Sequence, residues 1–317
     1  MDNVLVIVAP GQGAQSPGFL APWLEDSDFR SRLESLSAAA DLDLVWAGTE
    51  ADADQIRATE TAQPLLVATG IAAAAQLFPG VEPSLARADA VAGHSVGELT
   101  ALAGAGVLTP DQAMVLVRER GRAMAEAAAV TPTGMTAVLG GDREEVLATI
   151  ERHGLTAAND NGPGQVVAAG TTEQLDAFAA DPPAKARVMP LSVAGAFHTE
   201  HMAPAVGRLA DLAADVEPGD PATRVLSNKD GQVVDGGRDL LDRLVGQIAS
   251  PVRWDLSLQT FADLGVTGIL ELPPAGTLTG IAKRALKGVD TFALKTPDQL
   301  DDARAFCAEH ATQEATE

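Results

Sequence analysis

The chain has 317 residues, of which 46% are hydrophobic and 21% charged, as is ordinary for a water-soluble globular protein. At roughly 100–200 residues per domain, this length favours two compact units with a sizeable core. The formal net charge of −22 at pH 7 repels nucleic acid and anionic membrane surfaces, so we expect neither as a partner.

The sequence also favours a cytoplasmic location. The apolar run over residues 4–9 is too short for the core of a signal peptide. No apolar run reaches the roughly 20 residues that a membrane-spanning helix needs, so no such segment is predicted. Cys307 is the single cysteine, which excludes an internal disulfide and is typical of a reducing compartment.

Short apolar strands and helices alternate in the first part of the chain. Strands are predicted over 4–9 and 88–92, and helices over 63–77, 98–105 and from 110 onward. Pro64 is placed in the first turn of its helix. Thr109 and Pro110 are typical of a helix start, and the helix that follows carries Arg118, Arg120 and Arg122.

Residues 134–193 have a pattern of their own. Strands are predicted over 135–139, 155–158, 165–169 and 187–193, and helices over 142–153 and 171–180. This β-α-β-β-α-β order is typical of a ferredoxin-like unit. We therefore predict an α/β protein in which a small subdomain, 131–194, is inserted into a larger domain, 1–130 and 195–300.

The rest of the large domain continues the α/β pattern. Strands are predicted over 225–228 and 268–272, and helices up to 214, over 239–250 and through 283–286. Residues 301–317 are predicted to form a charged C-terminal tail.

Residues 93–97, Gly-His-Ser-Val-Gly, match the nucleophile elbow G-x-S-x-G. Such a turn holds its serine between a strand and a helix, at a helix N-terminus where free N–H groups favour an oxyanion. With 30 glycines in the chain, the string alone is only moderate evidence, and a chance match in a structural turn is the plain alternative. The predicted strand before Ser95 and helix after it favour the catalytic interpretation.

A nucleophilic serine needs a base, and the chain has five histidines. His94 is assigned a packing or hydrogen-bonding role, His153 the capping of a helix end, and His310 a place in the charged tail. His198 and His201 remain as candidate bases. His198 is favoured because it follows an apolar stretch where the chain returns to the large domain.

The loop Gly11-Gln12-Gly13 lacks the residues of a phosphate loop or of a dinucleotide fingerprint. A backbone N–H from this loop fits better as a second oxyanion donor, which elbow enzymes take from another strand-to-helix loop. No cysteine or histidine spacing predicts a metal site.

Four separated motifs together resemble the malonyl-CoA:acyl carrier protein transacylases of fatty acid and polyketide synthesis. They lie at residues 10–15, 93–98, 195–198 and 278–280. The resemblance implies an α/β-hydrolase-like core with an inserted ferredoxin-like small subdomain. It also implies transfer of a malonyl group from malonyl-CoA to the phosphopantetheine thiol of an acyl carrier protein. The thioester is then the substrate, and neither cofactor nor metal is expected.

The resemblance assigns a role to each matching residue. Ser95 is the acylated nucleophile and His198 the general base and acid. The backbone N–H groups of Gln12 and Val96 form the oxyanion hole. Gln247 lies beside the catalytic histidine, where a carbonyl group orients the ring.

Two further residues are expected to choose the acyl group. Arg120 lies on the helix after the elbow, where the family binds the substrate carboxylate, and a guanidinium can bind that carboxylate through two hydrogen bonds. Without the family match, a surface arginine would be the preferred interpretation. Phe197 precedes His198 and is expected to leave little room for a methyl group on malonyl C2. The family's Gly-Pro-Gly before the 278–280 motif is replaced by residues 273–276, Pro-Pro-Ala-Gly.

Two other classes remain open from the sequence. One is a serine esterase or thioesterase built on the same elbow, although such enzymes usually place the histidine near the C-terminus. The other is a non-catalytic module that docks carrier proteins. Because carrier proteins are acidic and this chain is too, docking requires a local basic group. Lys283, Arg284 and Lys287 are the first candidates, with Lys185 and Arg187 second.

Overall fold

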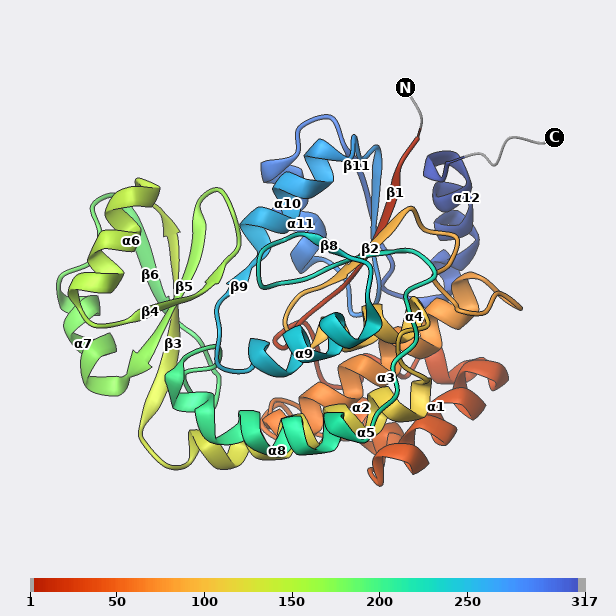
Figure 1. Cartoon of the computed structure of the whole chain (residues 1–317), viewed down its shortest axis with the longest axis horizontal. Helices are drawn as coiled ribbons and strands as arrows, with labels where there is room; N and C mark the ends of the chain where they lie inside the picture. The colour runs from red at the N-terminus through yellow and green to blue at the C-terminus, as the bar shows by residue number, and fades with distance from the viewer. Residues whose placement is uncertain (1–2, 313–317) are drawn as a thin grey trace.

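The computed structural model describes residues 3–312, which form two β-sheets with helices packed around them (Figure 1). The larger sheet lies at the centre of the molecule, and the smaller one stands beside it with its own pair of helices. The α/β prediction is confirmed. The active-site candidates all lie where the two sheets face each other.

The larger sheet has six strands in the order β11-β10-β1-β2-β7-β8. These are β1 (Leu5–Ala9), β2 (Ala90–Gly93), β7 (Arg224–Leu226), β8 (Val233–Val234), β10 (Gly268–Glu271) and β11 (Asp290–Ala293). All neighbouring pairs are parallel except the pair of β7 and β8. The three central strands β10, β1 and β2 are buried throughout, as expected when helices cover both faces of a parallel sheet.

Ten α-helices among the described residues belong to this larger unit. They are α1 (Ser27–Ala40), α2 (Leu44–Thr49), α3 (Thr59–Leu77), α4 (Gly97–Gly104), α5 (Pro110–Ala128), α8 (Ala203–Ala214), α9 (Gly237–Gln247), α10 (Trp254–Asp263), α11 (Thr277–Ala285) and α12 (Leu300–His310). α5 begins at the predicted place, because Thr109 Oγ1 accepts a hydrogen bond from Gln112 N and Gln112 Oε1 accepts one from Thr109 N. The prediction that Pro64 lies in the first turn of its helix is wrong. α3 begins at Thr59, so Pro64 lies in the second turn.

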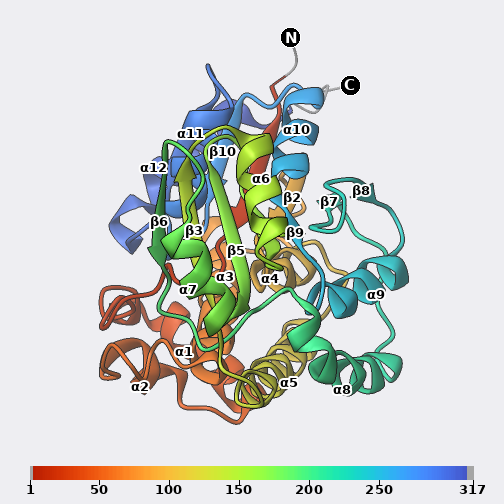
Figure 2. The same ribbon diagram turned by 90° about the vertical axis from the view of Figure 1, so that its left-hand side faces the viewer.

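The smaller sheet has the order β6-β3-β5-β4-β9. Its first four strands are β3 (Thr133–Gly140), β4 (Thr156–Asp160), β5 (Gln165–Thr171) and β6 (Ala186–Pro190), and α6 (Arg143–Arg152) and α7 (Thr172–Ala180) join them. Figure 2 shows both helices in front of this sheet. The order of the four strands is that of a ferredoxin-like unit.

The fifth strand of the smaller sheet comes from the large domain. β9 (Val252–Arg253) pairs in parallel with the end of β4, through Asn159 and Asp160. Arg143 of α6 and Arg253 of β9 both form ion pairs with Asp255 at the start of α10. The pairing of β9 with β4 and the ion pair between Arg143 and Asp255 therefore tie the small subdomain to the large domain, while the pair of Arg253 and Asp255 lies within the large domain.

Most of the predicted charged tail is helical. Residues 300–310 form α12, in which Ala303, Cys307 and His310 are buried because their spacing places them on one face. His310 Nδ1 lies 3.1 Å from Thr267 Oγ1, next to the start of β10. Residues 313–317 of the predicted tail lie outside the described residues.

Candidate active site

Ser95 lies on a sharp turn between β2 and α4, the local context expected of a nucleophile elbow. Its φ angle is 54°, a left-handed conformation that non-glycine residues rarely adopt. A Cβ on Gly93 would lie 1.9 Å from the carbonyl carbon of Gly97, and a Cβ on Gly97 would lie 2.3 Å from Ala9 O. Both positions therefore require glycine for the turn to close against β1.

His198 is the histidine that reaches the serine. Its Nε2 lies 2.7 Å from Ser95 Oγ, and its Nδ1–H donates to the main-chain carbonyl of Gln247 at 2.8 Å. This second bond fixes the tautomer in which Nε2 can accept the serine proton. Burial and, to a smaller extent, the positive charge of Arg120 lower the pKa of His198 to about 3, so the ring is neutral at physiological pH.

The other histidines lie elsewhere. His201 is in the short 3-10 helix Glu200–Met202. His94 donates from Nε2 to Asn161 Oδ1 at 2.8 Å and so joins the elbow to the small subdomain. His153 lies at the C-terminal end of α6, with Nδ1 2.9 Å from Thr149 O. The structure therefore places His198, and not His201, at the nucleophile.

Arg120 is fully buried, in contrast to the surface arginine that composition alone would favour. Its Nη1 donates to Gln63 Oε1 at 2.7 Å and its Nη2 to Gln247 Oε1 at 2.8 Å, while Nη2 also lies 3.4 Å from Ser95 Oγ. Burial lowers the pKa of Arg120 to about 10, and Glu98 opposes this change, so the side chain stays charged at neutral pH. Its Nε is buried and has no partner among the described residues.

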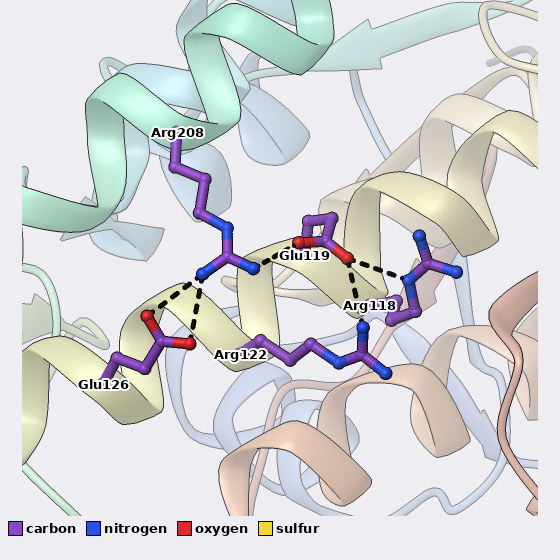
Figure 3. A network of polar contacts seen from close by, with 5 residues as sticks. All are labelled: Arg118, Glu119, Arg122, Glu126 and Arg208. Carbon is purple, nitrogen blue, oxygen red and sulfur yellow. Dashed lines mark hydrogen bonds and ion pairs between the residues drawn. The ribbon is translucent and has the colours of Figure 1, made fainter.

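The neighbours of Arg120 on α5 face the opposite way. Figure 3 shows Glu119 between Arg118 and Arg122, with Arg208 of α8 reaching across to it. Arg208 also donates to both carboxylate oxygens of Glu126, at 3.0 and 3.1 Å. The ion pairs of Arg208 join α5 to the helix that follows the His198 segment.

A cavity of about 230 Å³ opens beside Ser95, between the two sheets. Gln12, Val96 and Phe197 line it from the large domain, and Asn161 and Leu191 line it from the small subdomain. The loop before Gln12 approaches the elbow closely, because a Cβ on Gly11 would lie 2.9 Å from His94 O. Five of the seven predicted site residues line this cavity, and the other two, Arg120 and Gln247, lie behind it in contact with Ser95 and His198.

Within residues 3–312, no group of three or more His, Cys, Asp or Glu side chains is arranged to hold a metal ion. No helix in the same range is long and apolar enough to cross a membrane.

Comparison with known proteins identifies the chain. A family model described as "Acyl transferase domain" matches residues 6–314. The malonyl CoA-acyl carrier protein transacylase of Mycobacterium tuberculosis (strain H37Rv) is 49% identical over 300 residues, which cover 94% of this chain and 99% of the relative. The chain belongs to the malonyl CoA-acyl carrier protein transacylase family.

Solved structures of transacylases have the same fold. The crystal structure of MCAT from Mycobacterium tuberculosis matches with a TM-score of 0.91 and 49% identity, over 95% of this chain and 99% of that one. A type II PKS malonyl-transacylase, solved in complex with its acyl carrier protein, matches with a TM-score of 0.87 and 30% identity, over 95% and 99% of the two chains. These matches confirm the predicted family and the predicted transacylase fold, with its ferredoxin-like subdomain.

The transacylase site also contains three buried polar residues that we did not predict: Gln63 of α3, Glu98 of α4 and Asn228 after β7. Gln63 and Glu98 are each followed by a mainly apolar stretch of helix, and a polar residue at the edge of such a stretch is the signal that could have revealed them. Asn228 carries no comparable signal, because asparagine after a strand is ordinary turn chemistry.

Proposed function

We propose that this protein transfers a malonyl group from malonyl-CoA to the phosphopantetheine thiol of an acyl carrier protein, through a malonyl ester on Ser95. The observation that carries the proposal is the 2.7 Å contact between Ser95 Oγ and His198 Nε2, with the buried Arg120 guanidinium beside it. A base-activated serine explains acyl transfer, and a buried cation next to it explains an acyl group that carries a carboxylate.

In the first half-reaction, Ser95 Oγ attacks the thioester carbonyl carbon while its proton passes to His198 Nε2. The carbonyl of Gln247 stabilises the imidazolium through Nδ1–H. The oxyanion accepts hydrogen bonds from the backbone N–H groups of Gln12 and Val96, which line the cavity beside Ser95. The carbon–sulfur bond then breaks, and CoA leaves as a thiol with the proton from His198.

The second half-reaction reverses these roles. The phosphopantetheine thiol gives its proton to His198 and its sulfur attacks the malonyl ester. The ester bond breaks, and Ser95 recovers its proton from His198. Every proton and electron pair is accounted for by the two thioesters, Ser95 and His198, so the chemistry calls for no cofactor.

Arg120 and Phe197 support the choice of malonyl. The guanidinium holds the malonyl carboxylate beside the nucleophile, where its Nε still lacks a partner. Phe197 is buried in the cavity wall and restricts the space next to His198. Steric exclusion of one methyl group accounts for discrimination of at least about tenfold against methylmalonyl-CoA.

The test is the mass of the intact protein after mixing with malonyl-CoA. We expect a gain of one malonyl group, and its loss when phosphopantetheinylated carrier protein is added, with malonyl appearing on the carrier. With methylmalonyl-CoA, the corresponding methylmalonyl ester should form at least about tenfold more slowly than the malonyl ester. Release of free malonate faster than transfer to the carrier would favour a thioesterase, and absence of any label would favour a docking module.

Docking of an acidic carrier protein requires local positive charge on this chain of net charge −22. Lys283 and Arg284 of α11, with Lys287 just beyond it, are all exposed, and we call them the α11 basic cluster. Arg284 Nη2 donates to Gln165 Oε1 at 3.0 Å, and Gln165 lines the cavity. The cluster therefore lies beside the cavity, within reach of a carrier protein that delivers its arm to Ser95.

Reversing Lys283 and Arg284 to Glu is expected to raise the KM for the carrier protein at least about fivefold, because like charges then face each other in the docked complex. Malonylation of Ser95 by malonyl-CoA should stay at the native rate. Steady-state kinetics with varied carrier concentration measures the first effect and intact mass the second. Reversing Lys185 and Arg187, the second candidate group, which is also exposed, tests the alternative docking site and should leave the carrier KM within about twofold of native. An unchanged carrier KM in the first variant would refute docking at the α11 basic cluster.

We also assign the protein to the cytoplasm. The single cysteine, Cys307, is a free thiol, as is typical of a protein in a reducing compartment. It is also buried, and burial raises the pKa of the thiol to about 12, which keeps it unreactive. Cell fractionation with an antibody to the native protein tests this location.

A further inference from the structure

Glu98 is a buried acid that no step of the proposed reaction uses. It lies in the first turn of α4, three residues after the nucleophile, and only 5% of its surface is exposed. A carboxylate at this depth is costly unless hydrogen-bond donors satisfy it. Its surroundings therefore indicate what it contributes.

Each oxygen of Glu98 faces a donor. Oε1 accepts from the backbone N–H of Asn228 at 2.6 Å, and Oε2 accepts a hydrogen bond from Gln247 Nε2. No acceptor for a carboxyl proton is among these contacts. The arrangement is that of an ionised carboxylate acting as a double acceptor.

The two partners of Glu98 both hold the backbone of Ser95. Asn228 Oδ1 accepts from Ser95 N at 2.7 Å, while Asn228 Nδ2 donates to Gly93 O at 2.7 Å. Gln247 Nε2 donates to Ser95 O at 3.1 Å. The strained turn at Ser95 is therefore fixed at both its N–H and its carbonyl by the side chains of two residues that donate to Glu98, Asn228 through its backbone and Gln247 through its amide.

Gln247 also connects Glu98 to Arg120. A carboxylate can only accept, so it requires the amide nitrogen of Gln247. A guanidinium can only donate, so it requires the amide oxygen, which accepts from Arg120 Nη2 at 2.8 Å. With Glu98 on one side and Arg120 on the other, the amide of Gln247 has a single satisfactory orientation.

We propose that Glu98 is a positioning residue for acyl transfer, which orients Asn228 and Gln247 and through them sets the nucleophile turn and the substrate-binding arginine. This role rests on the proposed function of the same site. It assigns to one buried carboxylate the alignment of two groups that touch the substrate, Ser95 and Arg120.

The test compares Glu98→Gln with Glu98→Asp. Gln keeps the size but offers only one acceptor, so one of the two N–H donors meets an NH₂ group. Asp is shorter but keeps both acceptors and the charge. We expect malonylation of Ser95 to fall about 100-fold in Glu98→Gln and less in Glu98→Asp, because a misplaced nucleophile costs about that much. The preference for malonyl over acetyl should fall in the same order.

A matched control separates positioning from stability. Glu271 is also fully buried and accepts hydrogen bonds from the N-terminal residues of α11, but it contacts neither Ser95 nor Arg120. Glu271→Gln should lower the melting temperature as Glu98→Gln does, and change the malonyl-to-acetyl preference less than about twofold. A Glu98→Gln variant that acylates as well as or better than Glu98→Asp would overturn the proposal, since a space-filling role predicts that ranking.

A second readout does not require malonyl-CoA. Ser95 can be phosphonylated by an uncharged fluorophosphonate, with fluoride as the leaving group, and the rate should follow the same order of variants. If the native protein took this probe but not malonyl-CoA, the proposed function would fail while the role of Glu98 was still measured. Equal probe rates in the native protein and Glu98→Gln would overturn the positioning role.

The unaltered protein offers a test that needs no variant. Burial raises the pKa of Glu98 to about 8, and the charges of Arg120 on α5 and Arg243 on α9 oppose the rise, as do the donors on Asn228 and Gln247. Acylation by malonyl-pantetheine, whose groups do not titrate in this range, should fall at least about tenfold from pH 9 to pH 6 as Glu98 takes up a proton. A flat rate over this range would overturn the need for ionised Glu98.

Discussion

Ser95→Ala is expected to take up no malonyl label and to transfer malonyl to carrier protein at least about 10⁴-fold more slowly than the native protein. The reason is that the ester cannot form without the hydroxyl whose oxygen lies 2.7 Å from His198 Nε2. Intact mass after mixing with malonyl-CoA measures the label, and single-turnover kinetics measures the rate.

His198→Ala should lose a comparable factor, because nucleophile and base act as one unit. The double variant should then be little worse than either single variant. His201→Ala is the matched control, since His201 lies three residues away in the 3-10 helix Glu200–Met202 and should keep its rate within about threefold. A larger loss in His201→Ala than in His198→Ala would contradict the assignment of the base, and normal transfer by Ser95→Ala would contradict covalent catalysis.

Arg120→Ala is expected to reverse the choice of acyl group. Removing the guanidinium leaves the malonyl carboxylate without its buried partner, at about 2–5 kcal/mol, so kcat/KM for malonyl-CoA should fall about 30- to 5,000-fold. Acetyl-CoA has no carboxylate and loses no such contact. In the native protein, bound acetyl-CoA leaves the buried Arg120 guanidinium without a carboxylate partner, and the variant removes this cost. The kcat/KM for acetyl-CoA should therefore rise relative to that for malonyl-CoA.

Arg118→Ala is the matched control for this substitution. Arg118 lies on the same helix but forms an ion pair with Glu119 (Figure 3) and has no contact with Ser95 among the hydrogen bonds of the described residues. Its removal should leave the malonyl-to-acetyl ratio within about twofold of native. Rates of label formation with the two thioesters measure the ratio, and retained acetyl transfer shows that Arg120→Ala is folded. An Arg120→Ala protein with the native ratio would show that another group recognises the carboxylate.

The local sequence determined much of the fold. β1, β2 and β10 are short runs of buried apolar residues, and their continuous hydrophobicity is the pattern of a strand covered on both faces. The order of elements in the small subdomain followed from hydrophobic periodicity in the same way. We predicted no element between residues 16 and 62, where the structure has α1 and α2, and no strand at β8 or β9, which have only two residues each. We also predicted the strand over 268–272 to be the last of the chain, but β11 follows it.

The site, too, was predictable only where it depends on local sequence. The turn at Ser95 was predictable because its glycines contact residues close in sequence or in the adjacent strand β1. His198 could be preferred to His201 from the residues alone but not selected, since the contact with Ser95 joins residues 103 positions apart. Gln63 was not predicted at all, because its role depends on the contact with Arg120, which lies 57 residues away in the sequence.

The sequence by itself determined the elbow that carries the proposed nucleophile, the α/β fold class and, through its motifs, the family. Each of these features depends on short segments of the sequence, because backbone preferences and hydrophobic periodicity act over a few residues. Only the tertiary structure decided which histidine serves Ser95, that Arg120 is buried, and that Glu98, Asn228 and Gln247 form one hydrogen-bonded group around them. Those residues lie on separate helices and loops, and the physical demand that links them, satisfying buried donors and acceptors, exists only once the chain has folded.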